Sequence, residues 1–131
     1  MNFKQSAILI CCVLPLFACV GGLDKPPPDE YELWMKQGIS VLEIKQALLE
    51  CGNPSPYSIS MSSATPDEFA KRDRCMELAG FSYIGRLGTY CKNSSKLASC
   101  QPEAVIPKRD PQRRFDSQFC KNYTQSDICK P

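Results

Sequence analysis

Apolar residues between positions 39 and 80 recur with helical spacing in two separate stretches. In the first stretch, Ser40 precedes Glu43 by three residues, which is the pattern of a capping box at the start of a helix. The apolar spacing then continues to Gly52, a residue type that commonly ends helices. We expect the buried face to carry Val41, Ile44, Leu48 and Cys51, and the solvated face to carry Glu43, Lys45, Gln46 and Glu50.

The second stretch follows the same rules. Thr65 is the predicted N-cap, Pro66 fits the first helical position, and Glu68 completes another capping box. Gly80 is placed to end this helix in a left-handed conformation. Alternating residue types at 81–84 then predict a short strand.

Regular patterns fade after the predicted strand. Residues 86–114 hold several prolines and many polar residues, and they are predicted to form a loop. One or two helical turns are expected within 115–121, with Asp116 as a weak cap. Together these patterns predict an α+β fold: a small, helix-dominated, disulfide-stapled domain with one or two short strands and a long irregular C-terminal segment.

The first eighteen residues have the pattern of a secretory signal peptide. Lys4 is followed by an apolar run that ends at Phe17, and the small residue Ala18 comes next. The run is about fourteen residues long, whereas a membrane-spanning helix needs roughly 20, which argues against a transmembrane anchor. We expect residues 1–18 to be a signal peptide, 19–30 a lipidated and proline-rich tether, and 31–131 a single domain.

The lipid is implied by a resemblance. The sequence Leu16-Phe17-Ala18-Cys19 resembles the lipobox of bacterial lipoproteins, which implies cleavage before Cys19 and lipidation of its sulfur. In such lipoproteins, an aspartate directly after the lipidated cysteine prevents sorting to the outer membrane. Val20 occupies this position, which implies sorting to the outer membrane. Phe17 departs from the usual lipobox, and an ordinary signal peptide without lipid is the alternative.

The chain contains nine cysteines, of which six follow the predicted tether. An even number of cysteines in a small exported domain is typical of a disulfide framework. Six cysteines permit 15 pairings, and the sequence alone does not select among them. We favour pairing of neighbours along the chain: Cys51–Cys75, Cys91–Cys100 and Cys120–Cys129. A zinc site is disfavoured because no Cys-x-x-Cys pair occurs.

Charge is distributed unevenly, although the net charge is only +2. Residues 19–85 contain 6 Lys and Arg against 10 Asp and Glu, whereas residues 86–131 contain 9 against 4. The basic half is either an ordinary solvated surface or a surface that binds an anionic partner. The residues selected as candidates for partner binding are Trp34, Arg109, Arg113 and Arg114. For Trp34 the alternative is packing over the helix pair.

The composition argues against catalysis. The chain has no histidine, which excludes Ser-His and Cys-His nucleophile pairs and histidine-ligated metals. The acidic residues of the second helix are Asp67, Glu68, Asp73 and Glu77. Their spacing is that of an exposed helix face rather than of an acid–base pair. We expect no catalytic residue, no metal site, no cofactor and no nucleic-acid partner.

Several short motifs resemble one group of bacterial proteins. They are Trp34-Met-Lys-Gln-Gly38, Glu50-Cys51-Gly52, Cys75-Met76 and Gly80-Phe81-Ser-Tyr83. In this order they look like small cysteine-rich lipoproteins of Gram-negative bacteria and their prophages, a group that implies no particular activity. Residues 38–54 also show a local likeness to BamE-type lipoproteins, which support outer-membrane barrel assembly.

These observations predict a membrane-anchored lipoprotein of the outer membrane in a bacterial cell envelope, with a structural or interaction role and no catalysis. Its expected partners are the membrane, through the lipid, and an envelope protein or another anionic surface. The alternative is a prophage-type lipoprotein that excludes superinfecting phage or inhibits an envelope component.

Overall fold

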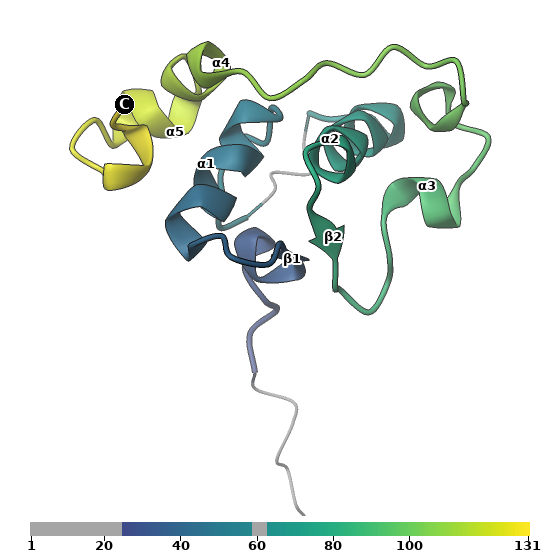
Figure 1. The fold of residues 1–131 in the computed structure, drawn as a ribbon, viewed down its shortest axis with the longest axis horizontal. Helices are drawn as coiled ribbons and strands as arrows, with labels where there is room; N and C mark the ends of the chain where they lie inside the picture. Colours follow the sequence, from purple (N-terminus) through teal and green to yellow (C-terminus); the bar gives the residue numbers. More distant parts are fainter. Residues whose placement is uncertain (1–24, 59–62) are drawn as a thin grey trace, which may run out of the picture.

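The computed structural model describes residues 25–58 and 63–131 (Figure 1). The predicted signal peptide, residues 1–18, and the predicted lipidation residue, Cys19, lie outside the described residues. With η marking a 3-10 helix, the elements are η1 (Glu30–Leu33), β1 (Trp34–Met35), α1 (Val41–Glu50), α2 (Pro66–Leu78), β2 (Ser82–Tyr83), α3 (Tyr90–Asn93), η2 (Ala98–Cys100), α4 (Pro111–Phe115), α5 (Gln118–Asn122) and η3 (Asp127–Cys129). The predicted fold class is confirmed: a small, helix-dominated domain with one two-stranded sheet and three disulfides among the described residues.

Both long helices begin as the sequence predicts. The hydroxyl of Ser40 accepts a hydrogen bond from the Glu43 N–H at 3.2 Å, and the Glu43 carboxylate accepts one from the Ser40 N–H at 2.9 Å. Thr65 and Glu68 repeat this capping box at the start of α2. These reciprocal bonds satisfy N–H groups that a helix start otherwise leaves without a partner.

The same two helices also end as predicted. Gly52 and Gly80 follow the last turns with φ of +94° and +87°, a conformation that L-residues with a side chain rarely adopt. After α2, the N–H of Phe81 donates to the carbonyl of Met76 at 3.1 Å, which is the long bond of a Schellman ending. Local chemistry therefore sets both boundaries of each helix.

β1 and β2 form the antiparallel sheet, in which Trp34 pairs with Tyr83 and Met35 with Ser82. The strand predicted at 81–84 is confirmed for its two central residues. The Trp34 ring packs edge-on against the Tyr83 ring, with 5.1 Å between centroids, and only 2% of Trp34 is exposed. Trp34 thus belongs to the larger core, as in the packing alternative stated for it, and a role for it in partner binding stays a prediction.

α1 is the central helix of the domain. It contacts η1, α2, α4 and η3, and in Figure 1 it lies between α2 and the C-terminal helices α4 and α5. Leu48 belongs to the larger core, which it shares with Met76 of α2. Leu49 packs with Cys120 and Ile128 in a separate, smaller cluster. Two consecutive residues of α1 thus pack into the two separate hydrophobic clusters of the domain.

Two positions of α1 differ from the predicted amphipathic pattern. Val41 is 53% exposed, because it stands in the first turn, ahead of Ile44, where α1 enters the core. Glu50, predicted to be solvated, is only 5% exposed. Its burial depends on residues far along the chain, which the helical period cannot reveal.

Three disulfides join neighbouring elements. Cys51–Cys75 links the end of α1 to α2, Cys91–Cys100 links α3 to η2, and Cys120–Cys129 links α5 to η3. These are the pairs favoured from the sequence. Disulfides at this density are typical of small domains in oxidising compartments, so they indicate an extracytoplasmic location.

No helix within the described residues combines the length and the apolar character that a bilayer crossing requires.

The C-terminal segment contains more regular structure than the sequence predicted. α3, η2 and α4 lie wholly or largely within residues 86–114, which were expected to form a loop. α4 begins at Pro111, and the carboxylate of Asp110 caps it by accepting a backbone N–H bond at 2.9 Å. α5 is capped by Ser117 rather than by Asp116, because the Ser117 hydroxyl accepts the N–H three residues on, at 3.1 Å.

Candidate functional site

An open cleft lies between the segment that follows α1 and the C-terminal pair α5 and η3. Its volume of about 630 Å³ is within the range of small-molecule sites. Its walls include the aromatic rings of Tyr57, Phe119 and Tyr123 and the side-chain amides of Gln118 and Asn122. Three serines and a proline complete the lining. Among the described residues that line it, none carries a charge.

α5 presents two pairs of side chains at the cleft, since a helix brings residues four positions apart onto one face. Gln118 and Asn122 form the first pair, in which the Gln118 Nε2 donates to the Asn122 Oδ1 at 2.9 Å. Phe119 and Tyr123 form the second pair, with ring centroids 5.0 Å apart and planes tilted by 39°. An amide pair and an aromatic pair are thus supplied by four residues within the six consecutive positions 118–123.

Tyr57 extends the aromatic wall from the other side of the cleft. Its ring centroid lies 5.9 Å from that of Phe119, so three rings form a continuous series. Tyr57 is 37% exposed and Tyr123 is 59% exposed, which leaves much of both rings accessible to a ligand. The Lys45 ammonium lies 4.6 Å from the Tyr57 centroid and donates to the Tyr57 hydroxyl at 3.3 Å. This cation–π contact and hydrogen bond hold the ring in place.

The backbone that carries Tyr57 is fixed to the N-terminal part of the domain. The Glu30 N–H donates to the Tyr57 carbonyl, and the Tyr31 N–H donates to the Pro56 carbonyl, both at 2.9 Å. Pro56 is among the most deeply buried side chains. This wall of the cleft therefore belongs to the folded domain.

Serine hydroxyls add hydrogen-bonding capacity at the cleft. The Ser55 Oγ accepts the Tyr57 N–H at 3.2 Å, and the Ser126 Oγ accepts the Ile128 N–H at 3.4 Å. A hydroxyl that accepts in this way can still donate its own proton to a ligand. The polar part of the cleft can therefore both donate and accept without a formal charge.

A small second core fixes α5 and η3 behind the cleft. Leu49 of α1 is fully buried and packs with Cys120 and Ile128. Phe119 packs against the same cluster while it also lines the cleft. The Cys120–Cys129 disulfide joins the two elements directly. The aromatic wall is therefore supported by apolar packing and by a covalent bond.

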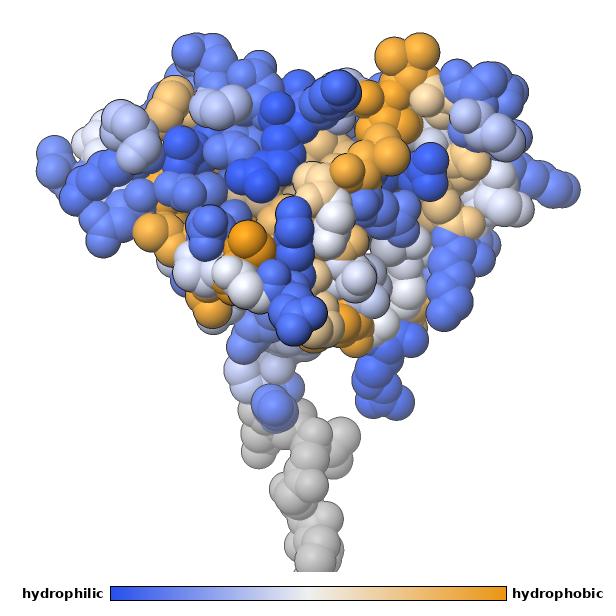
Figure 2. Space-filling view, viewed as in Figure 1, coloured by the Kyte–Doolittle hydropathy of each residue, from blue (hydrophilic) through white to orange (hydrophobic). Residues whose placement is uncertain are grey.

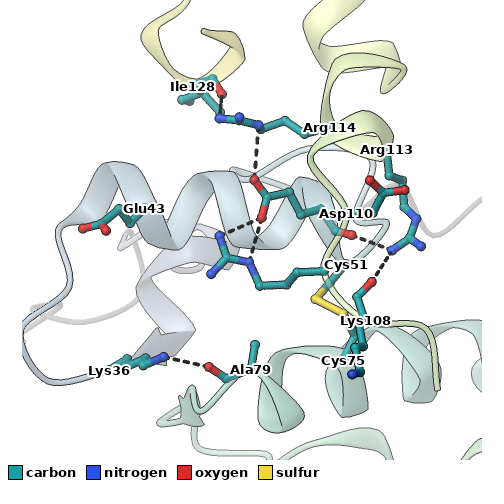
Figure 3. Close-up of polar contacts among 12 residues, drawn as sticks. Lys36, Glu43, Cys51, Cys75, Ala79, Lys108, Asp110, Arg113, Arg114 and Ile128 are labelled. Carbon is teal, nitrogen blue, oxygen red and sulfur yellow. Dashed lines mark hydrogen bonds and ion pairs between the residues drawn. A yellow bond between two sulfur atoms is a disulfide. The ribbon is translucent and has the colours of Figure 1, made fainter. Parts of the chain in front are cut away.

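The three arginines predicted to bind a partner all contact Glu50. Figure 3 labels two of them, Arg113 and Arg114. Arg109 places Nε and Nη2 each 2.7 Å from the Glu50 Oε2. Arg114, 5% exposed, has Nε 3.3 Å from Oε1 at ion-pair distance without hydrogen-bond geometry, and its Nη1 donates to the Ile128 carbonyl at 2.9 Å. Arg113 donates to the Glu50 main-chain carbonyl. Each of the three arginines therefore has a structural contact with Glu50. Arg109 and Arg113 keep part of their surface exposed, and partner binding by these residues stays a prediction.

A second groove, of about 520 Å³, borders the extended segment between η2 and α4. Leu78, Ala79 and Ile106 line it, and Lys108 and Arg109 lie at its edge. Figure 2 shows apolar residues at the upper edge of the domain, where Figure 1 places this segment. The groove lacks the neutral hydrogen-bonding side chains of the aromatic cleft, which makes the aromatic cleft the stronger candidate site.

A partly buried pair of carboxylates lies on the other side of α1. The Asp73 Oδ2 accepts the Tyr90 N–H at 2.8 Å. Burial raises the pKa of Asp73 to about 7, the Tyr90 hydrogen bond opposes this, and the charges of Glu30 and Glu77 add to it. Burial also raises the pKa of Glu30, whose carboxylate accepts the Trp34 Nε1–H at 3.2 Å. Because both pKa values are raised, we expect the free energy of unfolding to depend on pH.

Other members of the predicted acidic cluster have structural partners. Asp67 accepts hydrogen bonds from the Ser99 N–H at 2.8 Å and from the Ser99 hydroxyl at 2.9 Å, and these bonds lower the pKa of Asp67. Glu68 completes the capping box of α2. Over residues 25–58 and 63–131, no three side chains of the cysteine, aspartate or glutamate type are grouped as a metal would require.

None of the cleft residues is among the site residues predicted from the sequence. One signal for them was present, because Gln118 with Asn122 and Phe119 with Tyr123 are two i,i+4 pairs in a segment with helical character. Tyr57 carries no such signal, since the contact that unites it with Phe119 joins segments about sixty positions apart.

Comparison of the chain with models of protein families, with curated proteins and with solved structures finds no match.

Proposed function

We propose that the chain is an exported, lipid-anchored protein of the bacterial outer membrane that binds a ligand in the aromatic cleft and has no catalytic role. The observation that carries this proposal is the cleft itself, where accessible rings and neutral polar side chains stand over a rigid support. Such a combination of an apolar wall with a few directed polar groups is characteristic of binding sites.

Export is supported by the three disulfides, which require an oxidising compartment to persist. Anchoring is supported by Cys19, which directly follows the short apolar run and Ala18. Multiple acyl chains on one residue would give stable attachment to a bilayer.

The start of the described chain suits a tether. Residues 25–28 are exposed and have no regular structure, and three of them are prolines. Asp29 already belongs to the domain, because its N–H donates to the Glu32 carboxylate at 2.8 Å. A polyproline stretch extends about 3.1 Å per residue, so residues 25–28 can add on the order of 12 Å of spacing ahead of Asp29.

A binding role without catalysis is supported by how the domain uses its charged groups. The buried carboxylate of Glu50 is occupied by arginines, and Asp67 by Ser99. The cleft, in contrast, offers no charged side chain among the described residues that line it. The ionisable side chains in the described lining are Tyr57 and Tyr123, so the lining offers no carboxylate or amine for general acid–base chemistry.

Metabolic labelling with palmitate tests the anchored part of the proposal. The wild-type chain in a Gram-negative host should incorporate label and sediment with outer membranes, and Cys19→Ser should lose both properties. Cys12→Ser is the matched control, because it removes a leader cysteine and should leave labelling and sedimentation unchanged. Persistent labelling of Cys19→Ser, or its absence from the wild-type chain, would overturn the lipid assignment.

A further inference from the structure

We infer that the aromatic cleft binds an uncharged saccharide, with a sugar ring seated on the series formed by Tyr57, Phe119 and Tyr123. This inference rests on the proposed binding function of the same cleft and adds the chemical class of its ligand. Three properties of the cleft lead to it: the faces of its rings, its neutral hydrogen-bonding groups and its lack of charge.

The aromatic rings suit the C–H faces of a sugar. An aromatic face carries partial negative charge and attracts the slightly positive hydrogens of a C–H group. The centroid spacings of 5.9 Å and 5.0 Å spread this surface over three adjoining rings. Because Tyr57 and Tyr123 are 37% and 59% exposed, a sugar ring can reach them without displacing the core.

The amides and hydroxyls suit the sugar hydroxyl groups. In the bonded pair, Gln118 uses one amide proton on the Asn122 oxygen, which leaves its own carbonyl oxygen and the Asn122 amide protons for a ligand. Ser55 and Ser126 each use an oxygen lone pair on a backbone N–H, so their hydroxyl protons can point to a ligand acceptor. These groups can both donate and accept hydrogen bonds, which matches the hydroxyl groups of a sugar, since each of those is a donor and an acceptor.

The absence of charge among the described lining residues separates a saccharide from other ligands of similar size. An anionic ligand would call for arginine or lysine in the lining. Lys45 is the cation that contacts a lining residue, and its ammonium is held between the Tyr31 and Tyr57 rings and on the Tyr57 hydroxyl. A proline-rich peptide can also dock on aromatic rings, but its prolines lack N–H groups, so the acceptors of the cleft would be left without donors. The volume of about 630 Å³ accommodates a short oligosaccharide segment rather than a macromolecular face.

The test uses the full chain, purified in a detergent without a sugar headgroup. The probes are four: an N-acetylglucosamine tetramer, a maltose-series tetramer, an acidic oligogalacturonate, and a peptide with the sequence of residues 24–31. Binding is followed by chemical shifts in NMR spectra and by titration calorimetry. At least one neutral tetramer should bind and perturb cleft resonances, and the acidic sugar should bind at least about tenfold more weakly.

Variants identify the groups responsible. Tyr123→Leu keeps apolar bulk but removes the ring face and should weaken binding of the neutral tetramer about tenfold, whereas Tyr123→Phe should retain most of it. Asn122→Ala should also weaken binding. Val105→Ala, at a position 91% exposed and away from the cleft lining, is the matched control and should bind like the wild-type chain.

Several results would overturn the saccharide assignment. They are no neutral-sugar binding up to about 10 mM, undiminished binding by Tyr123→Leu, stronger binding of the peptide than of either neutral sugar, or cleft resonances that shift only with protein concentration, as in self-association. Palmitate labelling and sedimentation are independent of this titration. If the sugar titration fails while palmitate labelling is intact, the saccharide assignment is rejected and the proposed lipid anchor is retained.

Discussion

Arg109 and Glu50 are joined by two contacts to a single oxygen, since the Nε and Nη2 of the guanidinium both lie 2.7 Å from the Glu50 Oε2. Glu50 is the last residue of α1, and Arg109 lies 59 positions further along the chain. With Arg114 on the second oxygen, this carboxylate fastens the C-terminal segment to the central helix. Three of the basic residues in this half of the sequence are therefore used for folding.

Replacing Glu50 tests this role. Glu50→Gln keeps the shape but leaves the buried guanidinium of Arg114 without a counter-charge, so the free energy of unfolding should fall by about 3 kcal/mol. Urea unfolding followed by circular dichroism measures the change. Glu103→Gln, at an exposed position, is the control and should change the free energy by less than about 0.5 kcal/mol. An equal effect of the two substitutions would contradict the role of Glu50.

Asp73 should make the stability fall as the pH rises. Its pKa is about 7 in the folded domain and near 3.8 when unfolded, so between these values the folded state binds more protons than the unfolded chain. The stabilising contribution of the protonated form is complete below about pH 4 and is lost as the pH rises through 7. The charged neighbours that face Asp73 are Glu30, Glu77 and Arg72.

Asp73→Asn removes this dependence and keeps an oxygen that can accept the Tyr90 N–H bond. One pKa unit corresponds to about 1.36 kcal/mol, and partial exposure of Asp73 reduces the effect, so the variant should be about 1 to 2 kcal/mol more stable than wild type at pH 8. At pH 4 the two should be nearly equal. Thermal unfolding across this range checks the prediction, and a variant that is less stable than wild type at pH 8 would contradict it.

Two disulfides with the same spacing provide a matched comparison. Cys120–Cys129 and Cys91–Cys100 each span 9 residues, so removal of either should cost a similar amount, about 2 to 3 kcal/mol. Only the first supports the cleft. The double Cys120→Ser and Cys129→Ser variant should therefore weaken binding of the neutral tetramer, and the double Cys91→Ser and Cys100→Ser variant should not. NMR titration at a temperature where both variants are folded distinguishes them.

Gly80 should resist substitution by residues that disfavour positive φ. A Cβ at this position, where φ is +87°, would also stand 3.2 Å from the Lys36 Nζ, which donates to the Ala79 carbonyl. Gly80→Ala should lower the free energy of unfolding by about 1 kcal/mol, and Gly80→Asn should lower it less because asparagine tolerates the left-handed conformation. Equal losses in the two variants would show that φ is not the cause.

Local signals explain what the sequence predicts well. The caps at Ser40 and Thr65 and the glycines at 52 and 80 act within one helical turn, so each helix boundary can be inferred from a few neighbouring residues. The same reasoning was available for α4, where Asp110 and Pro111 form a start signal. Pro111 begins a helix at this position, although prolines elsewhere in residues 86–114 interrupt regular structure.

Distant contacts explain what the sequence does not predict. Glu50 lies on the polar side by helical period, but its burial depends on arginines about sixty positions away. The aromatic cleft likewise exists only because Leu49 draws α5 and η3 against α1, which places Phe119 beside Tyr57. Periodicity within one element contains no information about such pairings.

The hydrogen bond from the Glu30 N–H to the Tyr57 carbonyl has a mechanical consequence. Glu30 directly follows Asp29, the first residue tied into the domain. Tension that enters along residues 25–28 therefore reaches this bond before it reaches α1 and α2. The residue at the other end of the bond is part of the cleft wall. A load pulling on the N-terminal end would thus be felt by Tyr57, and the hold on a bound ligand would depend on how hard the domain is pulled.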